Sequence, residues 1–419
     1  MKKIKMRRPI AISLSPNTEK DDIRLAWKLL FSPWRWRNSE YVKLFEKEFA
    51  AKFGARYRAI ALNSGRSALY LILKALGVGK GDEVAIQAFT CVAVPNSVIW
   101  TGARPKYIDI DDSYNLDPRD LKRKLGRQTK AVIIQHTFGI AANVNAIKQI
   151  AKKSGLTLIE DCAHALGLSV NGWKAGTFGD ISFFSFGRDK ILSSIFGGVI
   201  LCSNEVDYRR IKRIVAKIAE PSAFWIFQQL FHPVAMSLIL PTYNLVLGKI
   251  FLYLLQRAGL LSKAVYKKEK IGQQPQFFPL KFPGGLALLA LNQLKKLEKY
   301  NKHRQKIASL YLKELRNLDF VLPSEEPRSL WLRFPVRHPN SKEIFLYAKN
   351  EGILLGDWYK GIIPPCKNLK KVFYTKGSCP NAEEYSEMIL NLPTYPALSE
   401  KEAQDVIFLL KEWETLRKR

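Results

Sequence analysis

The stretch Ile181–Cys202 reads ISFFSFGRDKILSSIFGGVILC, and it indicates how this chain is built. Two short apolar runs, 181–186 and 197–202, are rich in β-branched and aromatic residues and are typical of strands. The segment between them shows no long helix, and it places Ser185 and Lys190 among aromatic residues and glycines. A lysine that only provides surface charge needs no such setting. A lysine that must lose its proton and act as a nucleophile does.

Outward from this stretch, similar apolar runs recur through the first half of the chain. They read YRAIAL, DEVAIQ, RPKYIDI, AVIIQH and LTLIED. Most of them alternate with segments of helical periodicity, such as NSGRSALYLILKAL and NVNAIKQIAKKSG. This alternation predicts an α/β fold in which helices cover both faces of a mostly parallel sheet.

The remaining patterns divide the chain into further units. We expect a basic N-terminal arm and helix over 1–40, a large domain over 41–205, and an apolar helical insertion over 206–275. Residues 276–300 are expected to return to the large domain and to begin a long helix. A smaller C-terminal α+β domain is expected over 301–419.

The composition restricts the partners and the compartment. The chain has 67 Lys and Arg against 37 Asp and Glu, a net charge of +30, which predicts attraction to anionic partners. It has no zinc-finger spacing and no aromatic RNA-binding strand motif, so we expect no nucleic-acid function. The five cysteines are scattered and form no CxxC pair, and the N-terminal apolar run is too short for a signal peptide. These features predict a cytoplasmic protein without disulfides, and we expect no metal site.

One segment is unusually apolar. Residues 222–248 contain no Asp, Glu, Lys or Arg, and basic residues flank them on both sides. The length is sufficient to cross a bilayer, but Pro233, Pro241 and several polar side chains argue against a simple crossing. We expect a broken helical hairpin at the inner face of the cytoplasmic membrane, with lysines at anionic headgroups. The alternative is an apolar insertion that packs in the core or in a dimer interface.

A candidate anion site follows the first of the apolar runs. In NSGRSAL a strand turns into a helix, so the backbone amides of Gly65, Arg66 and Ser67 lie at a helix N-terminus. These amides and the helix dipole favour a phosphate group. Ser185 can donate a further hydrogen bond to the same group.

A second set of residues suggests what carries the phosphate. Asp161 ends an apolar run, at the sheet edge where α/β proteins bind their ligands. A buried carboxylate there can keep a ring nitrogen protonated, while Lys190 forms an imine with an aldehyde. A phosphate site, a carboxylate and a nucleophilic lysine are together what a protein supplies to pyridoxal 5'-phosphate (PLP).

The chain resembles the DegT/DnrJ/EryC1/StrS family of sugar aminotransferases, which have the fold-type I aminotransferase architecture. The matching stretches begin at NSGRSALYLILKAL, TKAVIIQHTFG, GTFGDISFFSF and CPNAEEYSEMI, and they cover most of 41–205 and 280–412. The resemblance implies that Lys190 bonds covalently to the cofactor and that Asp161 pairs with its pyridinium nitrogen. His164 would then contact the phenolic oxygen.

The resemblance also places Ser185 and the turn Gly65–Ser67 at the phosphate, and it implies a homodimer with active sites at the interface. One departure concerns the cofactor ring. The family usually has an aromatic residue over this ring, where the chain has Cys91. Cys91 is therefore expected to contact the cofactor as a smaller group, and the neighbouring Phe89 is a candidate for the missing aromatic surface.

The expected reaction is PLP-dependent transamination of a nucleotide-linked or lipid-linked keto-sugar, for amino-sugar or surface-glycan biosynthesis. Glutamate is the amino donor that the resemblance implies. One alternative is sugar dehydration and deoxygenation, although relatives with that activity tend to have histidine at the lysine position. Another is a non-catalytic, membrane-bound scaffold or regulator of the same fold. The sequence does not specify the sugar, the ring position or the carrier.

Overall fold

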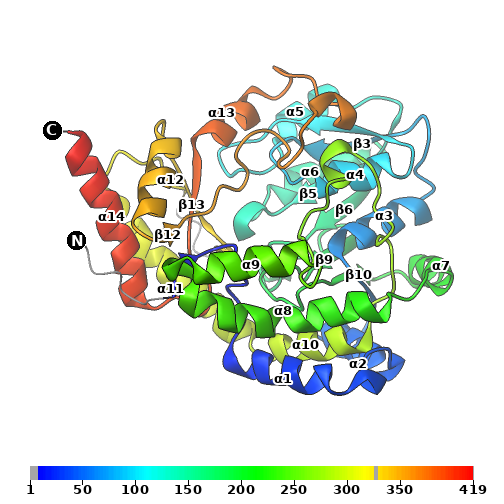
Figure 1. The fold of residues 1–419 in the computed structure, drawn as a ribbon. Coiled ribbons are helices and arrows are strands. Elements are labelled where there is room, and N and C mark those ends of the chain that lie inside the picture. The colour runs from blue at the N-terminus through cyan, green and yellow to red at the C-terminus, as the bar shows by residue number, and fades with distance from the viewer. Residues whose placement is uncertain (1–7, 325–328, 419) are drawn as a thin grey trace.

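A seven-stranded sheet forms the centre of the large domain in the computed structural model, which describes residues 8–324 and 329–418 (Figure 1). The strand order is β2-β10-β9-β6-β5-β3-β4, and every neighbouring pair is parallel except the two pairs that include β10. The strands are β2 (Arg58–Leu62), β3 (Glu83–Gln87), β4 (Arg104–Ile108), β5 (Thr129–Gln135), β6 (Thr157–Asp161), β9 (Ile181–Ser185) and β10 (Gly198–Cys202). The prediction of a mostly parallel sheet is confirmed.

The antiparallel strand β10 explains why the two apolar runs in Ile181–Cys202 follow each other without a helix between them. A parallel connection needs a crossover segment, usually a helix, and the described residues between β9 and β10 form none. Strand β10 therefore returns beside β9, with Gly198 opposite Ser185 and Cys202 opposite Ile181. Lys190 lies in the loop of this hairpin, at the carboxyl end of β9.

Helices cover both faces of the sheet, and strand residues alternate between two buried layers. Ile60 and Leu62 of β2 pack in one core cluster, whereas Ala59 and Ala61 pack in the other. The helices of the first face are α3 (Gly65–Ala75), α4 (Ala93–Ile99) and α7 (Glu205–Ala216). Those of the second face are α2 (Ser39–Ala51), α5 (Pro118–Lys124), α6 (Val144–Lys153) and α10 (Gly284–Leu294).

The C-terminal domain is built on two small sheets. Strand β11 (Phe334–Arg337) pairs antiparallel with β13 (Ile389–Leu392). The N-terminal arm contributes β1 (Ile10–Ala11), which pairs in parallel with β12 (Ile353–Leu354), so the start of the chain is part of this domain. Its helices are α12 (Ser341–Asn350), α13 (Pro380–Met388) and α14 (Glu400–Arg417). The sequence did not reveal this pairing, because a two-residue strand has no detectable periodicity.

The remaining elements are short. Strands β7 (Ser169–Val170) and β8 (Trp173–Lys174) form a small hairpin. The 3-10 helices are η1 (Pro33–Arg35), η2 (Thr137–Gly139), η3 (Tyr243–Leu245), η4 (Glu269–Ile271) and η5 (Leu369–Val372).

The long helix expected from about residue 285 is two helices, α10 and α11 (Leu297–Leu315). The interruption is at Lys296, whose ammonium group lies 3.1 Å from Glu19, 2.9 Å from Asp21 and 2.9 Å from Asp22. The last two of these acids belong to helix α1 (Lys20–Leu30). The pattern of apolar residues continues through the interruption, which is why the sequence suggested one helix.

The apolar segment forms a helical hairpin of α8 (Ala223–Thr242) and α9 (Leu247–Arg257), joined by η3. Helix α8 runs through Pro233 and Pro241 without a break, and it packs against α1 and α10 (Figure 1). Residues 223–245 are long and apolar enough to cross a membrane, with a mean hydropathy of 1.4, but 61% of that window is buried in the protein. Helix α8 is therefore a core helix, which agrees with the core-packing alternative for this half of the hairpin.

Candidate active site

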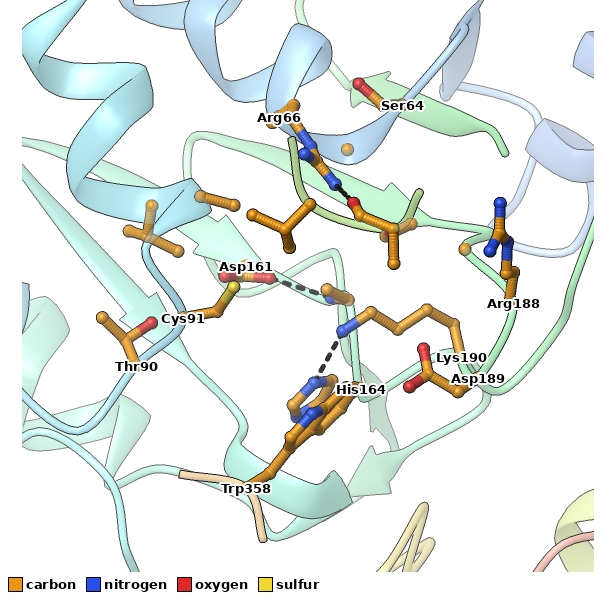
Figure 2. Close-up of a pocket in the computed structure, with 18 of the residues that line it drawn as sticks. Ser64, Arg66, Thr90, Cys91, Asp161, His164, Arg188, Asp189, Lys190 and Trp358 are labelled. Carbon is orange, nitrogen blue, oxygen red and sulfur yellow. Dashed lines mark hydrogen bonds between the residues drawn. The ribbon is translucent and has the colours of Figure 1, made fainter. Parts of the chain in front are cut away.

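A cavity of about 430 Å³ lies where the carboxyl ends of β6 and β9 meet the first turn of α3 (Figure 2). This is the edge at which open α/β sheets bind ligands. Its lining residues include Ser64, Gly65, Arg66, Thr90, Cys91, Asp161, His164, Ser185, Arg188, Asp189, Lys190 and Trp358. Seven of the residues expected from the sequence are therefore together in one cavity.

The hydrogen bonds around Lys190 indicate its protonation state. Its Nζ is 2.9 Å from Nε2 of His164, and the backbone amide of Phe138 donates to Nδ1 of the same ring at 3.2 Å. Because Nδ1 accepts a hydrogen bond, the proton of the neutral ring is on Nε2. Nε2–H then donates to Lys190, whose amine must be neutral in order to accept. This is the form in which a lysine attacks an aldehyde.

Burial acts in the same direction. It lowers the pKa of Lys190, although the nearby negative charges of Asp189 and Asp161 oppose the effect. Burial, with the nearby charge of Arg333, holds the pKa of His164 well below its usual range. The structure therefore favours a neutral Lys190 amine and a neutral His164 ring, joined by one hydrogen bond from Nε2–H to Nζ.

Asp161 is the last residue of β6 and is buried, yet it has few partners. The amide of Ala163 donates to its Oδ1 at 2.9 Å, and Figure 2 shows the side chain of Asp161 at the cavity. Burial raises the pKa of Asp161 to about 6, and the hydrogen bond from the Ala163 amide offsets only part of this effect. A buried carboxylate that faces a cavity with one amide partner is suited to pair with a cation, such as a protonated ring nitrogen.

The first turn of α3 forms a compact cradle for an anion. A Cβ on Gly65 would lie 2.9 Å from Cβ of Ser185, so only glycine allows this turn to approach the end of β9 so closely. The first amides of a helix have no acceptor within the helix, so those of Gly65 and Arg66 are suited to bind an anion in the cavity. Ser67 is arranged differently from the expectation. Its amide donates to the hydroxyl of Ser64 at 3.1 Å, and Ser64 lines the cavity in its place.

Cys91 lines the cavity as expected, and burial raises the pKa of its thiol, which therefore stays protonated at neutral pH. Phe89 does not compensate for the missing aromatic surface, because it is 1% exposed and packs on Tyr114 and Tyr359 outside the cavity. Aromatic residues that do line the cavity include Trp358, Tyr359, Phe183 and Phe196, and Trp358 has the largest ring.

Several contacts fix Trp358 in place. Its ring stacks on His164 with centroids 5.3 Å apart, and the Lys190 Nζ is 4.5 Å from its ring centre. The side chain of Asn391 accepts from the backbone amide of Trp358 at 2.9 Å and donates to its carbonyl at 2.8 Å. The guanidinium of Arg333 lies 3.4 Å from the ring centre on Trp358 and donates to Asp189 at 2.7 Å.

The main chain of the Lys190 loop is also held by distant segments. Asn17 of the N-terminal arm donates a hydrogen bond to the carbonyl of Lys190. Arg304, which is buried in α11, donates to the carbonyl of Ile191 at 3.1 Å. The nucleophile is therefore placed by parts of the chain more than 100 residues away in either direction, which restricts its motion.

Comparison with known proteins identifies this arrangement. The sequence model of the DegT/DnrJ/EryC1/StrS aminotransferase family matches residues 16–228 and 252–411. The chain belongs to this family. The two matched ranges include every residue discussed above at the cavity, and only 229–251 separates them.

Relatives of this aminotransferase extend over nearly the whole chain. GDP-perosamine synthase of Vibrio cholerae is 27% identical over 91% of this chain and 93% of its own. Spore coat polysaccharide biosynthesis protein SpsC of Bacillus subtilis (strain 168) is 29% identical over 95% of both chains. The solved structure of S. venezuelae DesV, in complex with a ketimine intermediate, is 25% identical, has a TM-score of 0.74 and is covered over 94% of both chains. The fold-type I architecture is confirmed.

The protein is an aminotransferase that depends on PLP, and the cavity fits this cofactor. The turn at Gly65 can hold the phosphate, Asp161 can pair with the ring nitrogen, and the neutral amine of Lys190 can bond to the aldehyde. The three groups lie around one cavity, as a single small molecule requires.

The sequence missed several residues of this aminotransferase site. Arg188 and Asp189 precede Lys190 directly, and a charged pair beside a nucleophile was a detectable signal. Trp358, Arg333 and Asn17 had no such signal. They come from irregular segments more than 140 residues from Lys190 in sequence, and only the fold brings them to the cavity.

Proposed function

We propose that this aminotransferase transfers an amino group from an amino acid, glutamate by the resemblance, to a nucleotide-linked or lipid-linked keto-sugar. The observation that carries this proposal is the placement of a neutral Lys190 amine and the buried Asp161 carboxylate on one cavity. The sugar class is supported by relatives, which include GDP-perosamine synthase and a dTDP-3-amino-3,6-dideoxy-alpha-D-galactopyranose transaminase of Aneurinibacillus thermoaerophilus. The net charge of +30 would favour the approach of an anionic substrate.

Each residue has a defined task in this proposal. Bound PLP supplies an aldehyde and an electron-accepting ring. Asp161 keeps the ring nitrogen protonated, and the amides of Gly65 and Arg66 hold the phosphate together with Ser185. Lys190 would be the base that removes and returns a proton at the α-carbon of the donor.

His164 and Trp358 would position the lysine. Because Nδ1 of His164 accepts from the Phe138 amide, its Nε2–H always points into the cavity, where it can donate to the lysine amine or to the phenolic oxygen. Trp358 closes the side of the cavity next to the amine and limits access of water to the reacting carbon.

The direct test is the Lys190→Ala variant. It should lose transamination by at least about 10³-fold, while a spectroscopic titration still detects noncovalent PLP. The wild-type protein should show an absorbance band that borohydride removes, and the variant should not. Undiminished turnover by the variant would show that another residue is the nucleophile. A panel of nucleotide keto-sugars with glutamate, followed by the cofactor absorbance, would identify the substrate.

A homodimer with active sites near its interface is proposed from the family resemblance. Light scattering at several protein concentrations should give about twice the 47.9 kDa chain mass. A mass of one chain under conditions that support full activity would contradict the dimer.

We further propose that the enzyme acts in the cytoplasm and that helix α9 contacts an anionic membrane. Helix α8 exposes Phe224 and Leu238, but α9 presents a larger set of apolar side chains to solvent. Among them are Leu247, Ile250 and Leu254, which are 63%, 50% and 53% exposed. Basic residues accompany them on the same segment, and these are Lys249, Arg257, Lys263, Lys267 and Lys268. Apolar side chains beside lysines are suited to the interface of an anionic bilayer.

Point variants test this contact better than a deletion, because α8 contributes Trp225, Ile226 and Leu230 to the core. The variant Ile250→Glu/Leu254→Glu should lose flotation with vesicles that contain phosphatidylglycerol. Val206→Glu, at an equally exposed apolar position on α7, is the matched control and should float like the wild type. Equal flotation of all three proteins, or no flotation of the wild type, would contradict membrane contact.

A further inference from the structure

Arg188 is a cation in the active-site cavity that the tasks assigned above do not use. Four cationic residues line this cavity, namely Arg66, Arg188, Lys190 and Lys360. Arg66 forms an ion pair with the buried carboxylate of Glu269, and Lys190 is present as the neutral amine. Lys360 follows Tyr359, on the side of the cavity where Trp358 lies. Arg188 remains as a charge without an assigned partner near the α3 turn.

The hydrogen bonds of Arg188 leave part of its guanidinium unsatisfied. Nη2 donates to the carbonyl and the hydroxyl of Ser262, each at 2.6 Å, and the guanidinium lies 5.6 Å from the ring centre of Phe196. The Nε atom is buried and has no hydrogen-bond partner, and no carboxylate of the described residues is within ion-pair distance of the side chain. A partly buried cation without a carboxylate partner is costly, and an anion in the cavity would reduce the cost.

The orientation of Arg188 is set from the helical hairpin. The hydroxyl of Ser262 donates to Oε1 of Gln229 at 2.6 Å, so toward Arg188 it can only accept. The other end of the Gln229 amide donates to the carbonyl of Trp225 at 3.0 Å, which fixes the amide orientation within α8. A continuous chain of hydrogen bonds therefore runs from the core helix α8 to the guanidinium. Gln229 is also the first residue that the family model leaves unmatched.

The position of Arg188 relates it to the α3 turn. Ser185 lies against Gly65, and Gly187 remains close to the Ser185 hydroxyl, so Arg188 follows two residues that lie near the α3 turn. Figure 2 shows Arg188 and Lys190 leaving this loop in different directions. The Lys190 amine points to His164, whereas the guanidinium points to the side of the cavity where Ser64 and Arg66 lie.

We propose that Arg188 is a ligand of the phosphate group of PLP and that Ser262 and Gln229 hold it in position. A phosphate dianion needs more positive charge than helix amides and a serine hydroxyl provide, and a guanidinium binds phosphate oxygens through charge-assisted hydrogen bonds. The inference rests on the cofactor placement in the proposed function. It adds a cofactor contact that depends on the segment inserted relative to the family.

The experiment compares PLP with pyridoxal, which has the same aldehyde and ring but no phosphate. Dissociation constants of both aldehydes are measured by absorbance titration on the full-length protein and on variants with native circular dichroism. In Arg188→Ala the affinity for PLP should fall by roughly 10- to 100-fold, while that for pyridoxal should change by less than about threefold. Arg188→Lys, which keeps a charge, should recover part of the preference for PLP.

Two more variants separate positioning from general damage. Gln229→Leu keeps the Arg188 side chain but removes the Gln229–Ser262 hydrogen bond that orients it. The affinity for PLP should fall by roughly 3- to 10-fold, with little effect on the affinity for pyridoxal. Arg209→Ala removes an exposed arginine on α7 and is the matched control, with both affinities unchanged.

Three results would overturn the inference. Equal losses for PLP and pyridoxal in Arg188→Ala would make Arg188 a structural residue. Unchanged PLP affinity with a raised KM for the nucleotide sugar would assign Arg188 to the substrate diphosphate instead. A preference for PLP that Arg188→Lys does not recover, together with no effect of Gln229→Leu, would exclude a positioned charge. Failure of the proposed function is distinguishable, because neither aldehyde would then form a borohydride-sensitive band with the wild-type protein.

Discussion

Two adjacent carboxylates at the end of β6, Glu160 and Asp161, are both buried and have opposite environments. Glu160 accepts hydrogen bonds from the His136 ring at 2.9 Å and from the amides of Gly176, Phe178 and Gly179. Asp161, one residue later on the other face of the sheet, accepts from a single amide among the residues that the structure describes. Burial alone would raise the pKa of both. In Glu160 the hydrogen bonds and the charge of His136 reverse the effect and lower it, and in Asp161 they do not.

The difference separates a structural carboxylate from a functional one. All donors around Glu160 come from the protein, so the fold itself provides its stabilisation. The donors around Asp161 are incomplete, so its stabilisation has to come from a bound ligand. Burial by itself therefore does not identify an active-site acid, whereas the number of donors that the protein supplies does.

We expect the largest loss of stability from a substitution of Glu160, the structural carboxylate. In Glu160→Gln the amide group would face backbone N–H donors that it cannot accept from fully, and the His136 interaction would weaken. We expect the free energy of unfolding at pH 7 to fall by about 3 kcal/mol, because several buried donors lose a charged acceptor. Urea denaturation of the cofactor-free protein measures this, and a loss below about 1 kcal/mol would contradict the structural role.

Replacing Asp161, the functional carboxylate, should change the free energy of unfolding in the opposite direction. The pKa of Asp161 is raised in the folded protein, so its contribution to stability is complete below the unfolded pKa and is lost as the pH rises from about 4 to about 6. Asp161→Asn should therefore stabilise the cofactor-free protein above pH 6 by up to about 3 kcal/mol, and should have little effect below pH 4. Urea midpoints over this pH range test the prediction. A variant that is less stable than the wild type at pH 8 would refute it.

Bound PLP should reverse the order of stability, so that the wild type becomes more stable than Asp161→Asn. A saturating cofactor at 100 times its dissociation constant should stabilise the wild type by about 2.7 kcal/mol. In Asp161→Asn the same concentration should stabilise the protein much less, because the amide cannot balance the charge of a protonated ring nitrogen. Thermal unfolding with and without PLP at pH 7.5 gives both values. Equal shifts in the two proteins would mean that Asp161 does not contact the cofactor ring.

The sequence supplied one member of this pair and missed the other. Asp161 was predicted from its position at a strand end, and the strand segments and the loop that carries Lys190 were predicted from the apolar runs, but the order of the strands in the sheet was not. The role of Glu160 depends on three amides in 176–179 and on His136, which a strand pattern does not contain. The same limit applies to Trp358 and Arg333, whose positions depend on tertiary packing. Helix α8 was difficult for a related reason, because an apolar segment reads alike whether protein or lipid covers it.

We expect the smallest loss of stability from removal of the Cys162 thiol, which also contacts Glu160. The thiol of Cys162 is 3.5 Å from Oε1 of Glu160 and is its weakest donor. Cys162→Ala should cost only about 1 kcal/mol more than Cys202→Ala, which removes a buried β10 thiol that makes no hydrogen bond to a carboxylate of the described residues, although the charge of Asp207 is near. Urea denaturation of both variants isolates the thiol–carboxylate bond. A difference above about 2 kcal/mol would mean that Glu160 relies on this thiol as much as on its amides.

The N-terminal arm has a practical consequence for anyone who shortens this enzyme. Strand β1 joins the C-terminal domain, and a few residues later Asn17 reaches the carbonyl of the nucleophilic lysine. Removal of residues beyond about residue 9 would therefore delete β1, and further truncation would delete Asn17. The N-terminal segment would then no longer connect the C-terminal domain with the loop that carries Lys190. Affinity tags and cleavage sites are better appended ahead of this segment, or after the last helix, than substituted for it.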